Sequence, residues 1–267
     1  MSHTFTAFKF AGLASAPVNH GMSGRVVDAP QEGNVGYLRD ADPKTVGRNR
    51  LAFLDELGIS PSDLTLARQT HSATVALVSP AERGRGGPPN FDGFPSTDAM
   101  ITNAPGVALA VTVADCVPLL LYDPTQLVLA VVHAGWRGTV DGITMAVVHA
   151  MRDTYGSEPS ELWAGIGPSI GPCCYEVGDE VIDAWHATQV VDAERAVVPG
   201  RGERRHLDLW DANVMQLTAA GVARDHIEVA HRCVRCELDR YFSHRAAMTG
   251  AAQRGLMMLV AQLQPRS

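Results

Sequence analysis

Three consecutive apolar runs in the middle of the chain constrain its fold most strongly. GVALAVTVADC (106–116), VPLLLYD (117–123) and LVLAVVH (127–133) are rich in β-branched residues. Apolar runs of this kind, bounded by polar or turn-forming residues, are typical of buried strands. A glycine-rich turn and then a stretch with apolar residues at helical spacing, 139–156, follow the third run. We therefore expect a mixed α+β fold with several long, buried strands.

Two capped helices and one ambiguous run complete the expected core. The segment 42–58 (DPKTVGRNRLAFLDELG) predicts a helix, because Asp42 can cap its first turn and Gly58 can end it. A second capped helix is expected over 208–221 (DLWDANVMQLTAAG). The run 255–263 (GLMMLVAQL) fits either a core strand or a helix, because its periodicity does not separate the two.

Composition and charge exclude several classes of protein. The formal charge of −7, without a basic tract, argues against a nucleic-acid partner, because phosphate binding relies on excess lysine and arginine. No apolar run approaches the roughly 20 residues that span a bilayer, and we expect neither a membrane segment nor a signal peptide. The five cysteines, an odd number, suit free thiols in a reducing compartment. We expect a cytoplasmic protein with one domain over residues 1–267, and the sequence does not indicate its oligomeric state.

Side chains that could carry chemistry stand where the apolar runs end. Cys116 closes the first run, His133 closes the third, and His71 lies between the strand-like pieces 64–69 and 73–79. A cysteine and a histidine at neighbouring strand ends can form a nucleophilic pair or bind zinc, and a third ligand would leave one tetrahedral position open. Free cysteines are also commonly buried for packing, so the spacing alone leaves a structural role open.

Four further residues have two interpretations each. Arg137 follows the third run and could be an ion-paired structural residue or a fork for phosphate or carboxylate. In RYFSHR (240–245), Ser243, His244 and Arg245 could be solvated surface, but the adjacent aromatic residues favour part of a pocket wall.

A CxxC pair near the C-terminus lacks the context of known CxxC sites. Cys233 and Cys236 lead into ELDRYFSHR, whereas a thioredoxin-like motif would follow a strand and open a helix. A zinc ribbon would need a second spaced pair, and Cys173 and Cys174 are adjacent, which is poor geometry for two ligands of one metal. We interpret these cysteines as free thiols.

Four segments together resemble the laccase-domain (YfiH-like) family, also called purine nucleoside phosphorylase/polyphenol oxidase-like proteins. They are TDAMITNAPGVALAVTVADCVPLLLYDP, AVVHAGWRGTVDGI, GIGPSIGPCCYEVG and DLWDANVMQLTAAGV. The ADC-P turn and HAGWRG are the most specific of these motifs, and the resemblance covers residues 34–250.

The resemblance implies a metal site, a fold and an activity. The metal would be held by the histidine of a Q-x-H turn, the cysteine of the DC pair and the histidine of HAGWRG, here His71, Cys116 and His133. Zinc is the expected cofactor, and copper is the alternative because older names describe copper-dependent polyphenol oxidases. The implied fold is a mixed-sheet α/β sandwich related to the catalytic core of cytotoxic necrotizing factors. The implied reactions are phosphorolysis of adenosine, inosine, guanosine or methylthioadenosine and deamination of adenosine, so a nucleoside and phosphate are the expected partners.

Residue roles follow as expectations from these reactions. Asp115 is expected to protonate the ammonia that leaves during deamination, or to be a structural carboxylate that caps its turn. Arg137 or Arg245 would hold phosphate, and Asn34 and Ser243 would contact the substrate. The sequence departs from the family pattern before Asn34 and again at 249–254, where TGAAQR stands in place of TGR. This second departure leaves open whether Arg254 replaces the family's arginine.

Three other functions compete with this hypothesis. A metal-independent cysteine hydrolase would use Cys116 and His133, for example on an amide of a peptidoglycan precursor. A copper oxidase would need more histidines at short spacings than the sequence contains. A nucleoside-binding module would bind adenosine and leave it intact.

Overall fold

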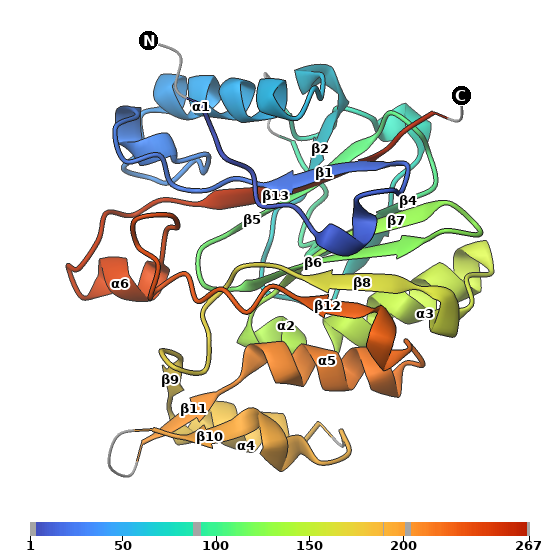
Figure 1. Cartoon of the computed structure of the whole chain (residues 1–267), viewed down its shortest axis with the longest axis vertical. Coiled ribbons are helices and arrows are strands. Elements are labelled where there is room, and N and C mark those ends of the chain that lie inside the picture. The colour runs from blue at the N-terminus through green and yellow to red at the C-terminus, as the bar shows by residue number, and fades with distance from the viewer. Residues whose placement is uncertain (1–3, 88–91, 189, 201–203, 266–267) are drawn as a thin grey trace.

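Two mixed β-sheets face each other, and helices cover their outer faces (Figure 1). The computed structural model describes residues 4–265 except 88–91, 189 and 201–203. Within these residues the order of layers is helix, four-stranded sheet, six-stranded sheet and helices. This arrangement confirms the predicted mixed α+β fold.

The four-stranded sheet has the order β1-β13-β5-β2. Its pairs are antiparallel except for β2 and β5, which run parallel. Its strands are β1 (Val18–Met22), β13 (Met257–Leu263), β5 (Ala108–Val113) and β2 (Leu64–Leu66).

The six-stranded sheet has the order β12-β8-β6-β7-β4-β3. Its inner pairs are antiparallel, and each edge strand runs parallel to its neighbour. Its strands are β12 (Ile227–Val229), β8 (Trp163–Ile166), β6 (Val117–Asp123), β7 (Val128–Ala134), β4 (Ala99–Thr102) and β3 (Val75–Leu77).

Successive side chains along the central strands point to opposite faces of the sheet and join different hydrophobic clusters. In β5, Leu109 and Val111 join the large cluster between the sheets, whereas Ala108 and Ala110 join a smaller cluster under α1 (Pro43–Glu56). Because full burial of a leucine-sized side chain contributes about 1.5–3 kcal/mol, a slip of one residue would exchange the two faces at high cost. The register of β5, and therefore the position of the turn that follows it, is strongly fixed.

Helices and a small third sheet surround this core. α3 packs on β7, β4 and β3, and α5 packs on α2 and α3. A small antiparallel sheet, β10-β11-β9, lies beside α4 at the lower end of the molecule in Figure 1. The helices are α2 (Trp136–Val140), α3 (Ile143–Tyr155), α4 (Asp179–His186), α5 (Leu209–Ala219) and α6 (His244–Met248), and the small sheet contains β9 (Glu176–Val177), β10 (Val197–Pro199) and β11 (Arg205–Leu207).

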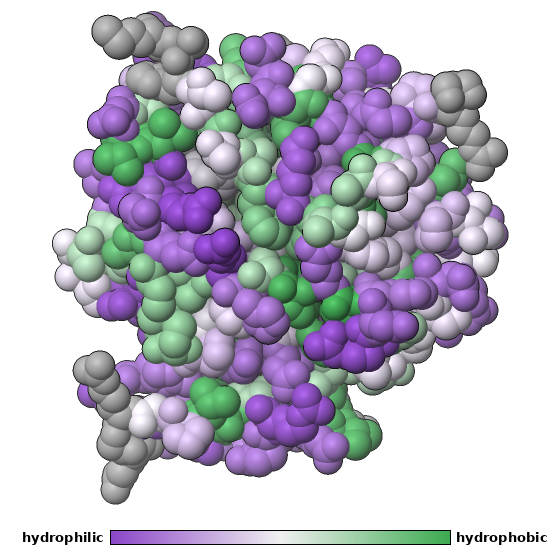
Figure 2. Space-filling view, viewed as in Figure 1, coloured by the Kyte–Doolittle hydropathy of each residue, from purple (hydrophilic) through white to green (hydrophobic). Residues whose placement is uncertain are grey.

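The two capped helices are confirmed, and the ambiguous C-terminal run is a strand. Asp42 accepts hydrogen bonds from the first turn of α1, and Asp208 does the same for α5. The run 255–263 contains β13. No helix in the described part of the chain has the length and apolar character to cross a membrane. On the face shown in Figure 2, hydrophobic residues form small groups among hydrophilic ones.

Candidate metal centre

His71, Cys116 and His133 converge at one end of the sandwich. Their ligand atoms all lie within 4.8 Å of one another. Cys116 lies in the turn between β5 and β6, and His133 is the penultimate residue of β7, opposite Pro118 in the antiparallel β6–β7 pair. The hairpin therefore places the cysteine and the histidine together, as the run ends predicted. The rings of His71 and His133 are 4.8 Å apart between centroids and nearly perpendicular, at 78°.

Asp98 orients His133. This fully buried carboxylate directly precedes β4, the antiparallel neighbour of β7. Nδ1 of His133 is 2.8 Å from Oδ1 of Asp98, and the His133 amide donates to the Asp98 carbonyl at 2.7 Å. A histidine that donates from Nδ1 presents Nε2 as a lone-pair donor, which is the usual arrangement around a protein-bound metal.

The same carboxylate shapes the turn that carries His71. The amides of Thr70, His71 and Ser72 donate to Asp98 at 3.1, 3.0 and 2.7 Å. His71 has a φ of 62°, a left-handed conformation that is costly for a non-glycine residue and is retained here by these hydrogen bonds. Burial alone would raise the pKa of Asp98, but the donors from His133 and Ser72 hold it well below its usual range. Asp98 is therefore a carboxylate that links two of the three candidate ligands.

Gln69 fixes the start of the same turn from the other sheet. Its side-chain Nε2 donates to the Thr112 carbonyl at 2.8 Å, and its Oε1 accepts from the Thr112 amide at 2.8 Å. The side-chain amide of Gln69 thus replaces the next pair of backbone hydrogen bonds between β2 and β5, whose pairing ends at Leu66 and Ala110. The backbone is free to leave the sheet, and His71 reaches the site two residues later.

Gly135 leaves room for the ligands. A Cβ at this position would lie 2.9 Å from Cδ2 of His71 and 3.0 Å from Sγ of Cys116. The first distance is shorter than real Cβ atoms show and the second is tighter than most, so the close approach of the backbone explains why glycine stands two residues after the third run. α2 begins at the next residue, Trp136.

Cys116 and His133 form a thiolate–imidazolium pair. Burial alone would raise the pKa of Cys116, but the adjacent His133 and His71 lower it to about 6. Burial alone would lower the pKa of His133, but the Cys116 thiolate and Asp98 raise it to about 9. Near neutral pH the cysteine is therefore a thiolate, the form that acts as a metal ligand or a nucleophile.

An open cavity of about 520 Å³ lies over these ligands. This volume falls within the roughly 300–1,000 Å³ that is typical of small-molecule sites. Burial raises the pKa of Tyr175, so its hydroxyl stays protonated. Polar and aromatic residues of the lining are Gln69, His71, Thr112, Asp115, Cys116, His133, Trp136, Arg137, Tyr175, His244, Arg245 and Arg254.

Asp115 connects the candidate metal ligands to the wall formed by α6. It has a left-handed φ of 84°, and its two oxygens accept from the Ser243 hydroxyl at 2.7 Å and the Arg245 amide at 2.6 Å. Burial raises the pKa of Asp115 in spite of these donors. Ser243 is buried and caps α6, while the Arg245 guanidinium donates to the Glu176 carbonyl at 2.9 Å. Of these, Asp115 and Arg245 line the cavity, and Ser243 lies behind the lining.

The other predicted substrate residues lie in different places. Arg137 lines the cavity, with its guanidinium carbon 4.2 Å from the Trp136 ring centroid. Asn34 is buried outside the cavity lining, where its Oδ1 accepts from the amides of Gly36 and Leu256. Its side chain therefore fixes the backbone that precedes β13. Arg254 does line the cavity, which shows that the shifted arginine of the TGAAQR segment reaches the site.

The sequence patterns did not single out Asp98 or Tyr175. Tyr175 lines the cavity although it does not stand at the end of an apolar run, whereas His244 lines it as a member of the predicted pocket-wall segment. Asp98 could have been suspected from one signal, a carboxylate placed directly before a buried strand. Its partner on β7 is visible only when the strand pairing is known.

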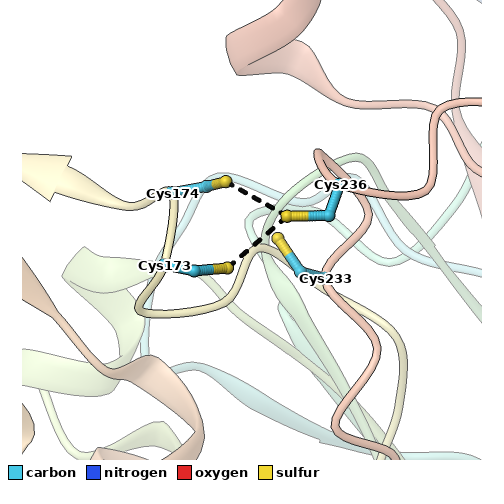
Figure 3. A group of neighbouring side chains, drawn as sticks. All are labelled: Cys173, Cys174, Cys233 and Cys236. Carbon is cyan, nitrogen blue, oxygen red and sulfur yellow. Dashed lines mark hydrogen bonds between the residues drawn. The ribbon is translucent and has the colours of Figure 1, made fainter.

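The four remaining cysteines form a second cluster, and all four are free thiols, as predicted for the CxxC pair. The sulfur atoms of Cys173, Cys174, Cys233 and Cys236, hereafter the four-cysteine cluster, lie within 4.8 Å of one another (Figure 3). The expectation that adjacent cysteines could not both approach one point is wrong. A tight turn closed by hydrogen bonds from the amides of Cys174 and Tyr175 to the Gly171 carbonyl directs both side chains toward the CxxC pair.

A protein-family comparison agrees with the motifs that shape this site. The family model described as multi-copper polyphenol oxidoreductase laccase matches residues 18–264. The chain belongs to this family. It is 36% identical over 215 residues to the purine nucleoside phosphorylase YlmD of Geobacillus stearothermophilus, covering 79% of this chain and 77% of that protein. It is 38% identical over 196 residues to the adenosine deaminase RL5 of an unknown prokaryotic organism, covering 73% of this chain and 74% of that protein.

The fold agrees with solved structures of the same family. The crystal structure of YlmD from Geobacillus stearothermophilus superposes with a TM-score of 0.90 at 30% identity, covering 99% of this chain and 98% of that one. The resemblance inferred from the ADC-P and HAGWRG motifs is confirmed.

Proposed function

We propose that this protein is a zinc-dependent purine nucleoside phosphorylase that also deaminates adenosine. The observation that supports this proposal most is the convergence of His71, Cys116 and His133 beside a cavity with three arginines in its lining. The curated relatives include both purine nucleoside phosphorylases and an adenosine deaminase. The cavity is large enough for a nucleoside.

The three residues fit a zinc ion. Two imidazoles and a thiolate are donors that zinc prefers, and three protein ligands leave the open position of a catalytic site. The Asp98 contact fixes the His133 tautomer, and the Cys116 thiol is already deprotonated near neutral pH. When bound, zinc would supply Lewis-acid chemistry and lower the pKa of a coordinated water toward about 7.

For phosphorolysis, the arginines are proposed to hold phosphate. In this reaction a phosphate oxygen bonds to the ribose C1′, the bond from C1′ to the purine nitrogen breaks, and the base departs with the electron pair. Guanidinium groups stay charged and match phosphate oxygens in pairs. Trp136 supports Arg137 through stacking at 4.2 Å, and the Glu176 carbonyl holds Arg245 at 2.9 Å, so both are oriented before phosphate arrives.

For deamination, Asp115 is the proposed acid. Water adds to the purine carbon that carries the amine, and ammonia leaves once its nitrogen has been protonated. Asp115 lines the cavity, and burial raises the pKa of its carboxyl, which favours a proton-donating role. Its hydrogen bonds from Ser243 and Arg245 support a positioning role as well. We propose that Ser243 and Asn34 act indirectly, by holding α6 and the segment before β13.

Product analysis tests this function. Zinc-loaded protein is incubated with adenosine and phosphate, and products are separated by chromatography. Adenine with ribose 1-phosphate, or inosine with ammonia, is expected, and intact adenosine after prolonged incubation would reject the proposal in favour of a binding module. Asp115→Asn separates the two roles of the carboxylate. A loss confined to inosine formation indicates the acid, whereas an equal loss of both reactions with a higher KM for phosphate indicates positioning of Arg245.

A cysteine hydrolase is the second candidate, and one observation favours it. Cys116, His133 and Asp98 form a nucleophile, a base and an orienting carboxylate, the arrangement of a catalytic triad. A kinship with the catalytic core of cytotoxic necrotizing factors would give this pair the same use, for example on a peptidoglycan-precursor amide. Iodoacetamide separates the functions, because a cysteine that acts as a metal ligand in the active protein is protected until a chelator is added. Activity that survives chelation and is lost on alkylation would favour the hydrolase.

A multicopper oxidase has less support. Among the described residues, the two groups of potential ligands are His71–Cys116–His133 and the four-cysteine cluster, and neither is a cluster of many histidines. Trinuclear copper chemistry would need such a cluster. Two histidines and a cysteine can also bind a single copper ion, so elemental analysis of active protein decides between zinc and copper.

A further inference from the structure

The four-cysteine cluster joins two segments that are far apart in the sequence. Cys173 and Cys174 follow β8, and Cys233 and Cys236 follow β12, the parallel neighbour of β8. Pairing between these strands continues beyond their ends, because the Ser169 amide donates to the Arg232 carbonyl and the Val234 amide donates to the Ser169 carbonyl. This extended pairing brings the two cysteine pairs to the same level, as Figure 3 shows.

The distances between the sulfur atoms match a tetrahedral metal site. Sγ of Cys236 lies 3.6 Å from Sγ of Cys173 and 3.5 Å from Sγ of Cys174, and all four sulfur atoms lie within 4.8 Å of one another. With zinc–sulfur bonds of about 2.3 Å, a regular tetrahedron has sulfur–sulfur edges of about 3.8 Å. A disulfide would need a separation of about 2.05 Å, so the spacing suits a shared central ion better than direct bonds.

A backbone amide stabilises the buried Sγ of Cys233 as a thiolate, which is the form that binds a metal. The Gly171 amide donates to Sγ of Cys233 at 3.3 Å. Hydrogen bonds to a ligating sulfur are a common feature around protein-bound metals. Cys233 is buried, Cys174 is half-buried, and Cys173 and Cys236 are exposed, so an ion could enter from the surface.

We propose that the four-cysteine cluster binds one Zn²⁺ as a structural site, separate from the site of His71, Cys116 and His133. Four thiolates complete a tetrahedron and leave no position for substrate, which is the pattern of structural zinc. Soft sulfur donors select zinc over the hard cations magnesium and calcium. The proposal does not depend on the proposed enzymatic function, because it concerns a different set of ligands.

This zinc fixes two walls of the cavity against each other. Tyr175 directly follows Cys174, and the segment after Cys236 leads to α6 and Arg245. Across the two walls, the Arg245 guanidinium lies 5.4 Å from the Tyr175 ring and donates to the Glu176 carbonyl. A zinc ion bound near the start of both segments would hold Arg245 at the distance from Tyr175 and Glu176 that these contacts need.

Metal content tests the proposal with reciprocal variants. Protein is expressed with zinc, purified under reducing conditions and analysed for zinc, copper and iron by mass spectrometry. We expect two zinc ions per wild-type chain, one in Cys116→Ser and one in the double variant Cys233→Ser/Cys236→Ser, with circular dichroism to verify folding. In the double variant, hydrogen exchange is expected to rise in residues 170–177 and 231–245 and to stay unchanged in β6 and β7. Equal zinc content in folded wild-type and double-variant protein would overturn the proposal.

A measurement on the intact four-cysteine cluster protects the test against a variant that fails to fold. X-ray absorption at the zinc edge of Cys116→Ser should show sulfur neighbours alone at about 2.3 Å. Absence of zinc in this variant, or a shell that contains nitrogen or oxygen ligands, would contradict a site made of four thiolates. Iron in place of zinc, or a disulfide among these four cysteines in reduced, zinc-supplemented protein, would contradict it as well.

Discussion

Replacing Asp98 by asparagine isolates the residue that links two of the candidate ligands. Oδ1 of Asp98 accepts from the His71 amide and from Nδ1 of His133, while Oδ2 accepts from Thr70 and Ser72. Asparagine keeps the shape but turns one oxygen into a donor. If its nitrogen replaces Oδ2, it faces the backbone donors of Thr70 and Ser72, and two hydrogen bonds are lost.

The less costly orientation places the new nitrogen toward His133. The ring can then accept the hydrogen bond at Nδ1 by moving its own proton to Nε2, and only the His71 amide loses its acceptor. One buried, unsatisfied donor costs about 1–3 kcal/mol, so the metal-free Asp98→Asn protein should unfold more easily by at least this amount. A His133 ring that binds zinc through Nε2 must carry its proton on Nδ1, which the asparagine nitrogen cannot accept, and loss of such a supporting contact typically weakens metal binding about 10–100-fold.

Two measurements on one set of proteins test this reasoning. Zinc affinity is measured by titration against a zinc-buffering chelator in the Cys233→Ser/Cys236→Ser background, and stability by urea unfolding of metal-free protein. Ser72→Ala is the matched control, because it removes a 2.7 Å hydrogen bond to Asp98 and keeps the carboxylate. The control should lose about 1–3 kcal/mol of stability and keep its zinc affinity within about twofold, because the carboxylate that orients His133 remains. Wild-type zinc affinity and an unchanged urea midpoint in Asp98→Asn would refute the role given to Asp98.

Four further outcomes follow from the same geometry. In metal-free protein, the pH midpoint for alkylation of Cys116 should lie near 6, well below the ordinary thiol value of about 8.5. His133→Ala should move this midpoint upward, and mass spectrometry of the alkylated peptide measures both midpoints. An ordinary midpoint in the parent protein would contradict the ion pair. The lowered pKa of the Cys116 thiol stabilises the folded protein fully above about pH 8.5, and this stabilisation is lost as pH falls through about 6. The raised pKa of His133 stabilises the folded protein fully below about pH 6.5, and this stabilisation is lost as pH rises through about 9. Between about pH 6.5 and 8.5 the pair therefore binds the same number of protons in the folded and unfolded states, so its contribution to the free energy of unfolding should not change with pH. This contribution is measured by urea unfolding as the difference between metal-free parent and Cys116→Ala. A steady change with pH in this range would count against the assignment. Gly135→Ala should weaken zinc binding by about tenfold or more, because its Cβ would lie 2.9 Å from His71 and 3.0 Å from Cys116; the same titration measures this, and unchanged affinity would show that the backbone can yield. Gly47 lies within α1, and a Cβ there would lie 3.6 Å from its nearest neighbour, the Tyr37 hydroxyl. Gly47→Ala should therefore stabilise the fold by about 0.5–1 kcal/mol in urea unfolding.

Buried strands and helix caps were predictable because their signals are local. The apolar runs 106–116, 117–123 and 127–133 contain β5, β6 and β7, and the capped segments contain α1 and α5. The run 255–263 could not be assigned, because β13 is covered on both faces. Met257 and Leu259 face the other sheet while Met258 and Val260 face α1, so all are apolar and the period of two is hidden.

The candidate site was predictable only where its residues mark strand ends. Spacing singled out His71, Cys116 and His133, yet their proximity depends on the β6–β7 pairing. Asp115 and Ser243 lie 128 residues apart, and no local pattern announces their hydrogen bond. The adjacent pair at 173–174 was misinterpreted because sequence does not show the direction in which a tight turn sends its side chains.

The anchoring of His71 between Gln69 and Asp98 has a consequence for the whole sandwich. Gln69 attaches the turn to Thr112 of the four-stranded sheet, and Asp98 attaches it to the six-stranded sheet that also carries His133. The three candidate ligands His71, Cys116 and His133 are therefore held by both sheets, and the distances between their ligand atoms depend on how the two sheets pack against each other. A substitution deep in the interlayer core, such as Leu109→Ala, should change zinc affinity without contacting any ligand. Selection on metal binding would then act on the packing of the entire interior.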